Sequence, residues 1–152
     1  MSDIVADIQY VLVDHFKIDA VYIPYGYQTP SFPSLRWPTG PRMETKYYLY
    51  YRYDIWRFTL FWTLILYGAV HAVAGLWAAL MNRRLKSGLI IAVYLFIGGI
   101  EAFISGSIIG AILGLIYSAG SFTMSTWIPF IWAVVQILTM IMISYSMSAV
   151  VM

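Results

Sequence analysis

Apolar residues run almost unbroken through three long stretches of this chain, and short polar segments separate them. The stretches cover residues 55–81, 88–118 and 127–150. Each is longer than the ~20 residues that a helix needs to cross the hydrocarbon core of a bilayer. Because backbone polar groups must be bonded within the segment in lipid, each stretch is expected to be helical. The pattern therefore predicts an all-α integral membrane protein with three transmembrane helices.

The second stretch carries a regular pattern of small residues. One recurs at every fourth position, at Gly98, Ala102, Gly106, Gly110 and Gly114. Small residues let membrane helices approach closely, and this packing holds them together in lipid. We therefore predict that this ridge packs against another helix, one that crosses it because a four-residue step winds around a helix of about 3.6 residues per turn. The stretch exceeds the bilayer thickness, so we expect a tilt or a break at Gly98–Gly99.

Residues 1–54 differ from the apolar stretches. Apolar positions at helical spacing over residues 3–17 predict an amphipathic helix, which would lie on the membrane or pack on the protein's own helices. Residues 18–45 hold five of the six prolines, with aromatic residues between them, which predicts a non-helical proline-rich arm. A partner protein and the membrane surface are candidates for what the arm contacts, and a mobile linker is the alternative. We divide the chain into this region and a transmembrane domain, residues 55–152.

Aromatic and basic residues gather where the first stretch begins. Tyrosines and tryptophans between residues 47 and 62 suit the boundary of headgroups and hydrocarbon, because their rings have an apolar body and a polar tip. Neighbouring basic side chains can reach phosphates. The predicted headgroup-facing residues are Arg52, Trp56, Arg57, Arg83, Arg84 and Lys86. The bases of residues 83–86 favour the cytosol, but those near the first stretch oppose them, so charge does not fix the orientation.

Three polar side chains lie within the stretches: His71, Glu101 and Gln136. A charge at the bilayer centre costs roughly 2.5–3.5 kcal/mol on insertion scales, so Glu101 requires a partner, a cavity or a proton. In antiparallel helices joined near Leu85, His71 and Glu101 have similar depth, and we hypothesise a direct contact. The alternatives are a backbone bond for His71 and a protonated or water-exposed Glu101. Gln136, at the depth of residues 107–110, is expected to form an interhelical hydrogen bond.

Composition agrees with this class and narrows the function. The chain is 11% charged, whereas a soluble domain is about 25% charged. A net charge of +2 without a long basic run gives no reason to expect a nucleic-acid partner. With no cysteine and two histidines far apart, we expect no metal site and no cofactor. The sequence contains no hydrolase elbow, phosphate loop or metalloprotease motif, so we predict a protein without catalytic residues, and not an enzyme.

Several short motifs follow one another in a characteristic order. Residues 61–80 read FWTLILYGAVHAVAGLWAAL, residues 116–120 read IYSAG, residues 128–130 read IPF, and Gln136 follows. Together they resemble the transmembrane protein 170 family over residues 58–140, without the N-terminal region. Glu101 is no hallmark of that family, so its role is argued from physical chemistry alone.

The resemblance implies a small three-span protein of the endoplasmic reticulum membrane and nuclear envelope, with a lumenal N-terminus. It also implies links to membrane shaping and to complexes of giant bridge-like lipid-transfer proteins. We therefore expect a non-enzymatic subunit that helps load or orient phospholipid at the donor membrane. Its partners would be membrane phospholipid and the large lipid-transfer protein or another membrane helix. The alternatives are a membrane-shaping protein that acts alone or as an oligomer, and an assembly factor for another membrane complex.

Overall fold

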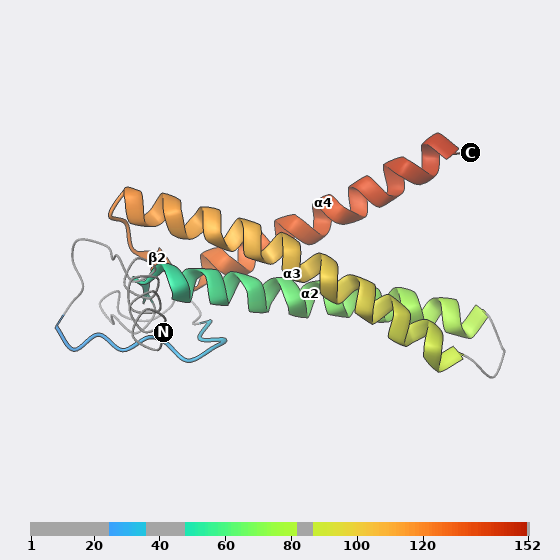
Figure 1. Cartoon of the computed structure of the whole chain (residues 1–152), viewed down its shortest axis with the longest axis horizontal. Coiled ribbons are helices and arrows are strands. Elements are labelled where there is room, and N and C mark those ends of the chain that lie inside the picture. Colours follow the sequence, from blue (N-terminus) through green and yellow to red (C-terminus); the bar gives the residue numbers. More distant parts are fainter. Residues whose placement is uncertain (1–24, 36–47, 82–86, 152) are drawn as a thin grey trace, which may run out of the picture.

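The computed structural model describes residues 25–35, 48–81 and 87–151. The predicted amphipathic helix at residues 3–17 lies outside this part of the chain, as does most of the predicted arm. Within the described part, three long helices dominate (Figure 1). They are α2 (Arg52–Met81), α3 (Ser87–Ala119) and α4 (Trp127–Val151).

All three helices are long and apolar enough to cross a membrane. The prediction of an all-α protein with three transmembrane helices is therefore confirmed. The break considered at Gly98–Gly99 is wrong, because α3 is helical throughout. Gly98 serves close packing against His71 without interrupting the backbone hydrogen bonds of the helix.

The helix ends follow from local sequence. At the start of α2, the Tyr51 carbonyl accepts the first hydrogen bonds, and Asp54 lies in the first turn, where a carboxylate suits the helix dipole. α3 ends when Phe122 N–H donates to the Tyr117 carbonyl at 3.0 Å while Ser121 adopts a φ of 52°. This bond and the positive φ of Ser121 are features of a Schellman motif, in which Ser121 occupies the position where glycine is usual. Pro129 falls in the first turn of α4, where its missing N–H costs nothing.

A two-stranded antiparallel sheet joins the starts of α2 and α4. β1 (Tyr48–Leu49) pairs with β2 (Met124–Ser125), so that Leu49 lies opposite Met124. Both of these side chains are fully buried. The aromatic residues from 47 to 62 were predicted to face the membrane interface, and the pairing of Tyr48–Leu49 with Met124–Ser125 was not predicted. Strands of two residues show no alternation from which they could be predicted.

α2 is the central helix of the bundle. It packs along α3 for most of its length and also contacts α4, whereas α3 and α4 barely meet. One buried cluster, which includes Leu49, Phe58 and Leu113, fills the end of the bundle that carries the strands. A second, smaller cluster lies near the middle, around Tyr67 and Ala102.

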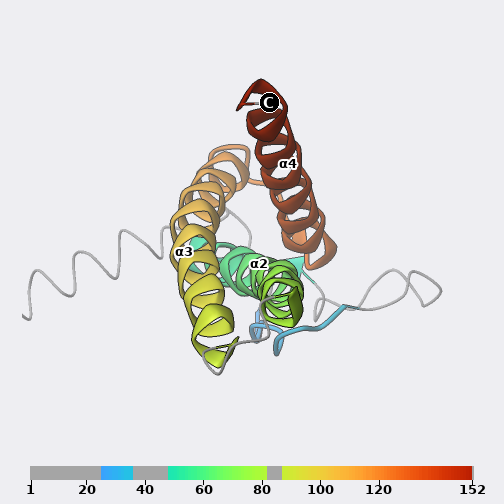
Figure 2. The same cartoon turned by 90° about the vertical axis from the view of Figure 1, so that its right-hand side faces the viewer.

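Beyond the second cluster, α4 diverges from the other two helices (Figures 1 and 2). Every residue from Ile141 to Ser146 is exposed. We call the end with the strands the closed end and the end where α4 diverges the open end. The two ends differ in how fully the chain packs against itself.

Candidate functional site

The ridge of small residues on α3 faces α2. A Cβ added to Gly106 would lie 3.1 Å from the Thr63 Cβ, and one added to Gly110 would lie 3.1 Å from the Trp56 Cα. Ordinary carbon contacts are about 3.5–4.0 Å. The ridge thus provides backbone-level contact between two helices of the same chain.

The other ridge residues follow the same line. At Gly114 an added Cβ would come within 3.4 Å of the Arg52 carbonyl oxygen, and at Gly98 it would overlap the ring of His71. Ala102 is fully buried in the second cluster. All five ridge positions therefore face inward, and the helix that they meet is α2.

A reciprocal contact on α2 was not predicted. Gly75 lies where an added Cβ would be 3.1 Å from the Tyr94 Cβ and 3.3 Å from the Ile91 Cα. This extends the close approach toward the open end. The run of small residues from Ala72 to Gly75 is a signal that could have identified it.

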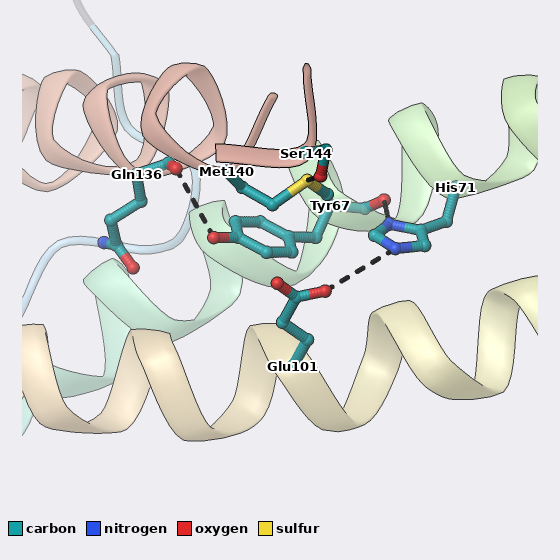
Figure 3. A network of polar contacts seen from close by, with 6 residues as sticks. All are labelled: Tyr67, His71, Glu101, Gln136, Met140 and Ser144. Atoms are coloured by element: carbon teal, nitrogen blue, oxygen red, sulfur yellow. Dashed lines mark hydrogen bonds and ion pairs between the residues drawn. The ribbon is translucent and has the colours of Figure 1, made fainter. Parts of the chain in front are cut away.

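His71 and Glu101 lie together near the middle of the helices. The His71 Nε2 is 3.7 Å from the Glu101 Oε2, and the His71 Nδ1 is 2.9 Å from the Tyr67 carbonyl oxygen (Figure 3). The hypothesised contact and the alternative backbone bond thus occur at the same time. Since a carbonyl only accepts, Nδ1 must carry the proton, and the neutral ring presents Nε2 as an acceptor. A hydrogen bond between Nε2 and Glu101 therefore requires one further proton, held by either residue.

The glutamate is only partly enclosed. Its side chain is 45% exposed, against 12% for His71. Figure 3 shows the carboxylate beside the Tyr67 ring, with one oxygen directed to His71. Glu101 lies one helical turn from Ser105, whose hydroxyl donates to Gln136 of α4. The His71 Nε2, at 3.7 Å, lies beyond hydrogen-bond distance of this carboxylate. The chain therefore leaves part of the Glu101 carboxylate open to its surroundings.

Gln136 connects all three helices. Its Oε1 accepts a hydrogen bond from the Ser105 hydroxyl at 2.6 Å, and its Nε2 donates to the Thr63 hydroxyl at 3.4 Å. The Tyr67 hydroxyl donates to its backbone carbonyl at 3.4 Å. An interhelical bond was expected, but at the depth of residues 107–110, and the partner lies nearer the open end. Crossing of the helices changes the register that a parallel arrangement would give.

The partners of Gln136 were not predicted. Thr59 and Thr63 are both fully buried, and each hydroxyl bonds the carbonyl four residues earlier in its own helix. The four-residue spacing of these threonines places them on one face, and this signal was available in the sequence. Among the described residues, no group of three or more histidines, cysteines or acids could hold a metal ion.

Arg52, Trp56 and Arg57 lie at the closed end. The backbones of Arg52 and Trp56 support the glycine ridge. The guanidinium of Arg57 lies 5.9 Å from the ring centre of Phe61. The Nε atoms of both arginines are shielded from solvent and have no hydrogen-bond partner in the described part of the chain. The other predicted headgroup residues, Arg83, Arg84 and Lys86, lie outside the described residues.

Part of the proline-rich arm, residues 25–35, packs across the closed end. The Phe32 ring is 5.1 Å from Trp62 and 5.5 Å from Phe58, measured between centroids. The hydroxyl of Thr126 donates to the Ser34 carbonyl at 3.0 Å. For this segment, the contacted surface is the chain's own helices. Trp62, predicted as part of the interfacial belt, is thereby enclosed by protein.

Two polar bonds fasten the same segment. The Tyr27 hydroxyl donates to the Tyr48 carbonyl at 2.7 Å, and the Thr29 hydroxyl donates to the Asp54 carboxylate at 2.8 Å. Burial raises the pKa of the Tyr27 phenol well above its usual range, and the nearby charge of Asp54 adds to the effect. Asp54 is only 6% exposed. The closed end is therefore tied together by its own polar groups.

Three apolar helices joined by a buried polar cluster define a multi-pass membrane protein. Residues 48–151 match the family described as transmembrane protein 170A/B-like, and the chain belongs to that family. It is 45% identical over 131 residues to a Saccharomyces cerevisiae protein described as "Uncharacterized protein YPR153W", covering 86% of this chain and 94% of the yeast protein. No solved structure matches. The family match is longer than the predicted resemblance over residues 58–140, and the yeast match also extends into the N-terminal region.

Proposed function

We propose that this chain is a non-enzymatic subunit of a lipid-transfer assembly in the endoplasmic reticulum membrane or nuclear envelope. It would help to load or orient phospholipid for a large bridge-like transfer protein. In this proposal the closed end lies on the lumenal side. Membership of the transmembrane protein 170A/B-like family and the three apolar helices support the membrane setting.

The observation that carries the proposal is the state of two arginines at the closed end. The Nε–H groups of Arg52 and Arg57 are shielded from water without an acceptor in the described part of the chain. A buried donor without a partner costs about 1–3 kcal/mol, and more when it is charged. Phospholipid phosphates accept paired hydrogen bonds from a guanidinium. Two such groups near the start of a membrane helix would hold or orient headgroups.

Lipid cross-linking tests this role. Purified protein in vesicles containing a phospholipid with a photoreactive headgroup should be labelled near the closed end. Replacing both Arg52 and Arg57 by glutamine should reduce labelling roughly thirtyfold, as expected if each of the two bidentate contacts contributes about 1 kcal/mol. The matched lysine variants retain the charge but lose the paired geometry, and they should give an intermediate value. Equal labelling of all variants would contradict headgroup binding.

The assembly itself needs a test in native membranes. Purification through an added tag should recover a large lipid-transfer protein, and deletion of the chain should slow phospholipid delivery between organelles. Recovery of the chain without any large partner, together with unchanged lipid flux on deletion, would remove the proposal.

Membrane shaping is a second candidate, favoured by the unequal ends of the bundle. The helices are held together at the closed end, while α4 diverges at the open end (Figure 1). A protein that is narrow at one end and broad at the other would occupy different areas in the two leaflets. The purified protein alone should then narrow or tubulate vesicles as its density increases. Vesicles that keep their size and shape would count against this role.

A further inference from the structure

The open end holds an acidic side chain that the chain leaves without a full set of partners. Glu101 is half exposed, and its nearest polar group is the His71 Nε2 at 3.7 Å. Beyond this level α4 diverges from α2 and α3 (Figures 1 and 2), and its residues Ile141–Ser146 are all exposed. We call the space between this part of α4 and the paired helices α2 and α3 the wedge.

The depth of Glu101 makes its exposure costly. It is near the middle of α3, which runs from Ser87 to Ala119. There, lipid offers no hydrogen bonds to a carboxylate, and acids at such positions face a partner or a cavity as a rule. His71 already gives its Nδ1 proton to the Tyr67 carbonyl. His71 can therefore reduce the desolvation cost of at most one oxygen of the Glu101 carboxylate.

We propose that the wedge receives a transmembrane helix of another protein, which places a lysine or arginine side chain on the Glu101 carboxylate. The assignment rests on the proposed role as a subunit, and it adds where the partner binds and which chemistry it carries. The cation would supply the missing donors and cancel a charge that lipid does not solvate. The exposed residues Ile141–Ser146 would give the helix an apolar wall on α4.

Two other occupants fit the site less well. A second copy of this chain offers no free cation at this depth among its described residues, because Arg52 and Arg57 lie at the closed end and His71 already faces Glu101. A phospholipid amine would bring its phosphate into the wedge. In the described part of the chain, the basic side chain near Glu101 is again that of His71.

Designed peptides in vesicles test the proposal. The chain has no cysteine, so a dye on Tyr25→Cys, an exposed position at the closed end, marks it uniquely. Energy transfer is measured to a labelled leucine–alanine helix of about 20 residues with either lysine or leucine at its centre. The lysine peptide should associate about tenfold more tightly, equal to about 1.4 kcal/mol. Glu101→Gln should abolish that preference.

Two variants that add bulk on opposite sides of α4 provide a second test, which is needed if Glu101→Gln does not fold. Ser144→Phe fills the wedge, whereas Met142→Phe adds the same group on the opposite side of α4, because two residues turn a helix by about 200°. Ser144→Phe should weaken binding of the lysine peptide, and Met142→Phe should not. Equal binding of both peptides, no effect of Glu101→Gln, or equal effects of the two phenylalanine variants would overturn the proposal.

Native membranes separate this proposal from the lipid-transfer function. A photoreactive residue at position 144 should cross-link to another protein, and Glu101→Gln should prevent it. Cross-links to lipid alone, or to a second copy of the chain, would also overturn the docking site. Loss of docking in Glu101→Gln with lipid delivery unchanged would retain the docking site and reject the transfer function.

Discussion

Replacing Gly106 and Gly110 with isoleucine should separate α3 from α2. The first carbon added at Gly110 would lie 3.1 Å from both the Cα and the carbonyl oxygen of Trp56, and backbone atoms cannot move aside as a flexible side chain can. At Gly106 the first carbon meets the Thr63 Cβ at the same distance. Isoleucine then adds three more carbons at each position.

The expected loss can be worked out from these contacts. Forcing extra carbons into a packed interface costs about 1–3 kcal/mol at each site, so the double variant should lose roughly 2–6 kcal/mol. The gain in helix propensity on replacing glycine is at most about 1 kcal/mol and cannot offset this. Gly99 is the matched control on the same helix, because an added Cβ there has nothing within 4 Å. Gly99→Ile should leave stability unchanged or slightly raised.

Unfolding by sodium dodecyl sulfate in mixed micelles provides the assay, followed by the fluorescence of the six tryptophans. Free energies of unfolding are compared for the wild type, the double variant and Gly99→Ile. The reasoning would be refuted if the double variant were as stable as the control. In that case the close approach of α2 and α3 would not be what holds the bundle.

Three further predictions concern the polar cluster and the closed end. Gln136→Leu should lower the free energy of unfolding by about 1 kcal/mol, whereas Thr139→Val, which removes an exposed hydroxyl bonded within its own helix, should change it by less than about 0.5 kcal/mol. Phe32→Ala should cost about 2 kcal/mol, below the 3–5 typical of a fully buried ring, and should speed amide exchange over residues 25–35. Because burial raises the pKa of Tyr27, the folded chain keeps a proton that the unfolded chain releases near pH 10. Stability should then fall as pH rises above about 10, and Tyr27→Phe should lessen this fall in alkaline unfolding curves. No loss with Gln136→Leu, unchanged exchange in Phe32→Ala, or the same alkaline slope for Tyr27→Phe would contradict the respective argument.

The features predicted correctly are those with a long sequence signal. Three apolar stretches are sufficient to define three membrane helices, because lipid leaves the backbone no other solution. The pairing of His71 with Glu101 followed from counting residues on either side of one turn. Such a count works only when two helices are adjacent, antiparallel and connected by a short segment.

The missed features depend on tertiary contacts that no periodic pattern reports. The position of Phe32 between Phe58 and Trp62 requires a segment distant in the sequence to fold back over the closed end. A tryptophan at the end of a membrane helix has the same composition signal whether it meets headgroups or protein. The partner of Gln136 was misplaced because the register depends on the crossing of α4, which its own sequence does not encode.

The difference between the two ends suggests how stability and binding are divided along the chain. α2 contacts α3, α4 and β1, and its close contacts with α3 are already made within the chain. Changes in α2 should therefore act first on folding. Residues Ile141–Ser146 of α4 are exposed, so changes at Ser144 should leave the bundle intact while altering what it binds. If Ser144→Phe instead destabilised the isolated protein as much as the Gly106 and Gly110 changes do, the open end would be part of the folded core, and no space for a partner would remain there.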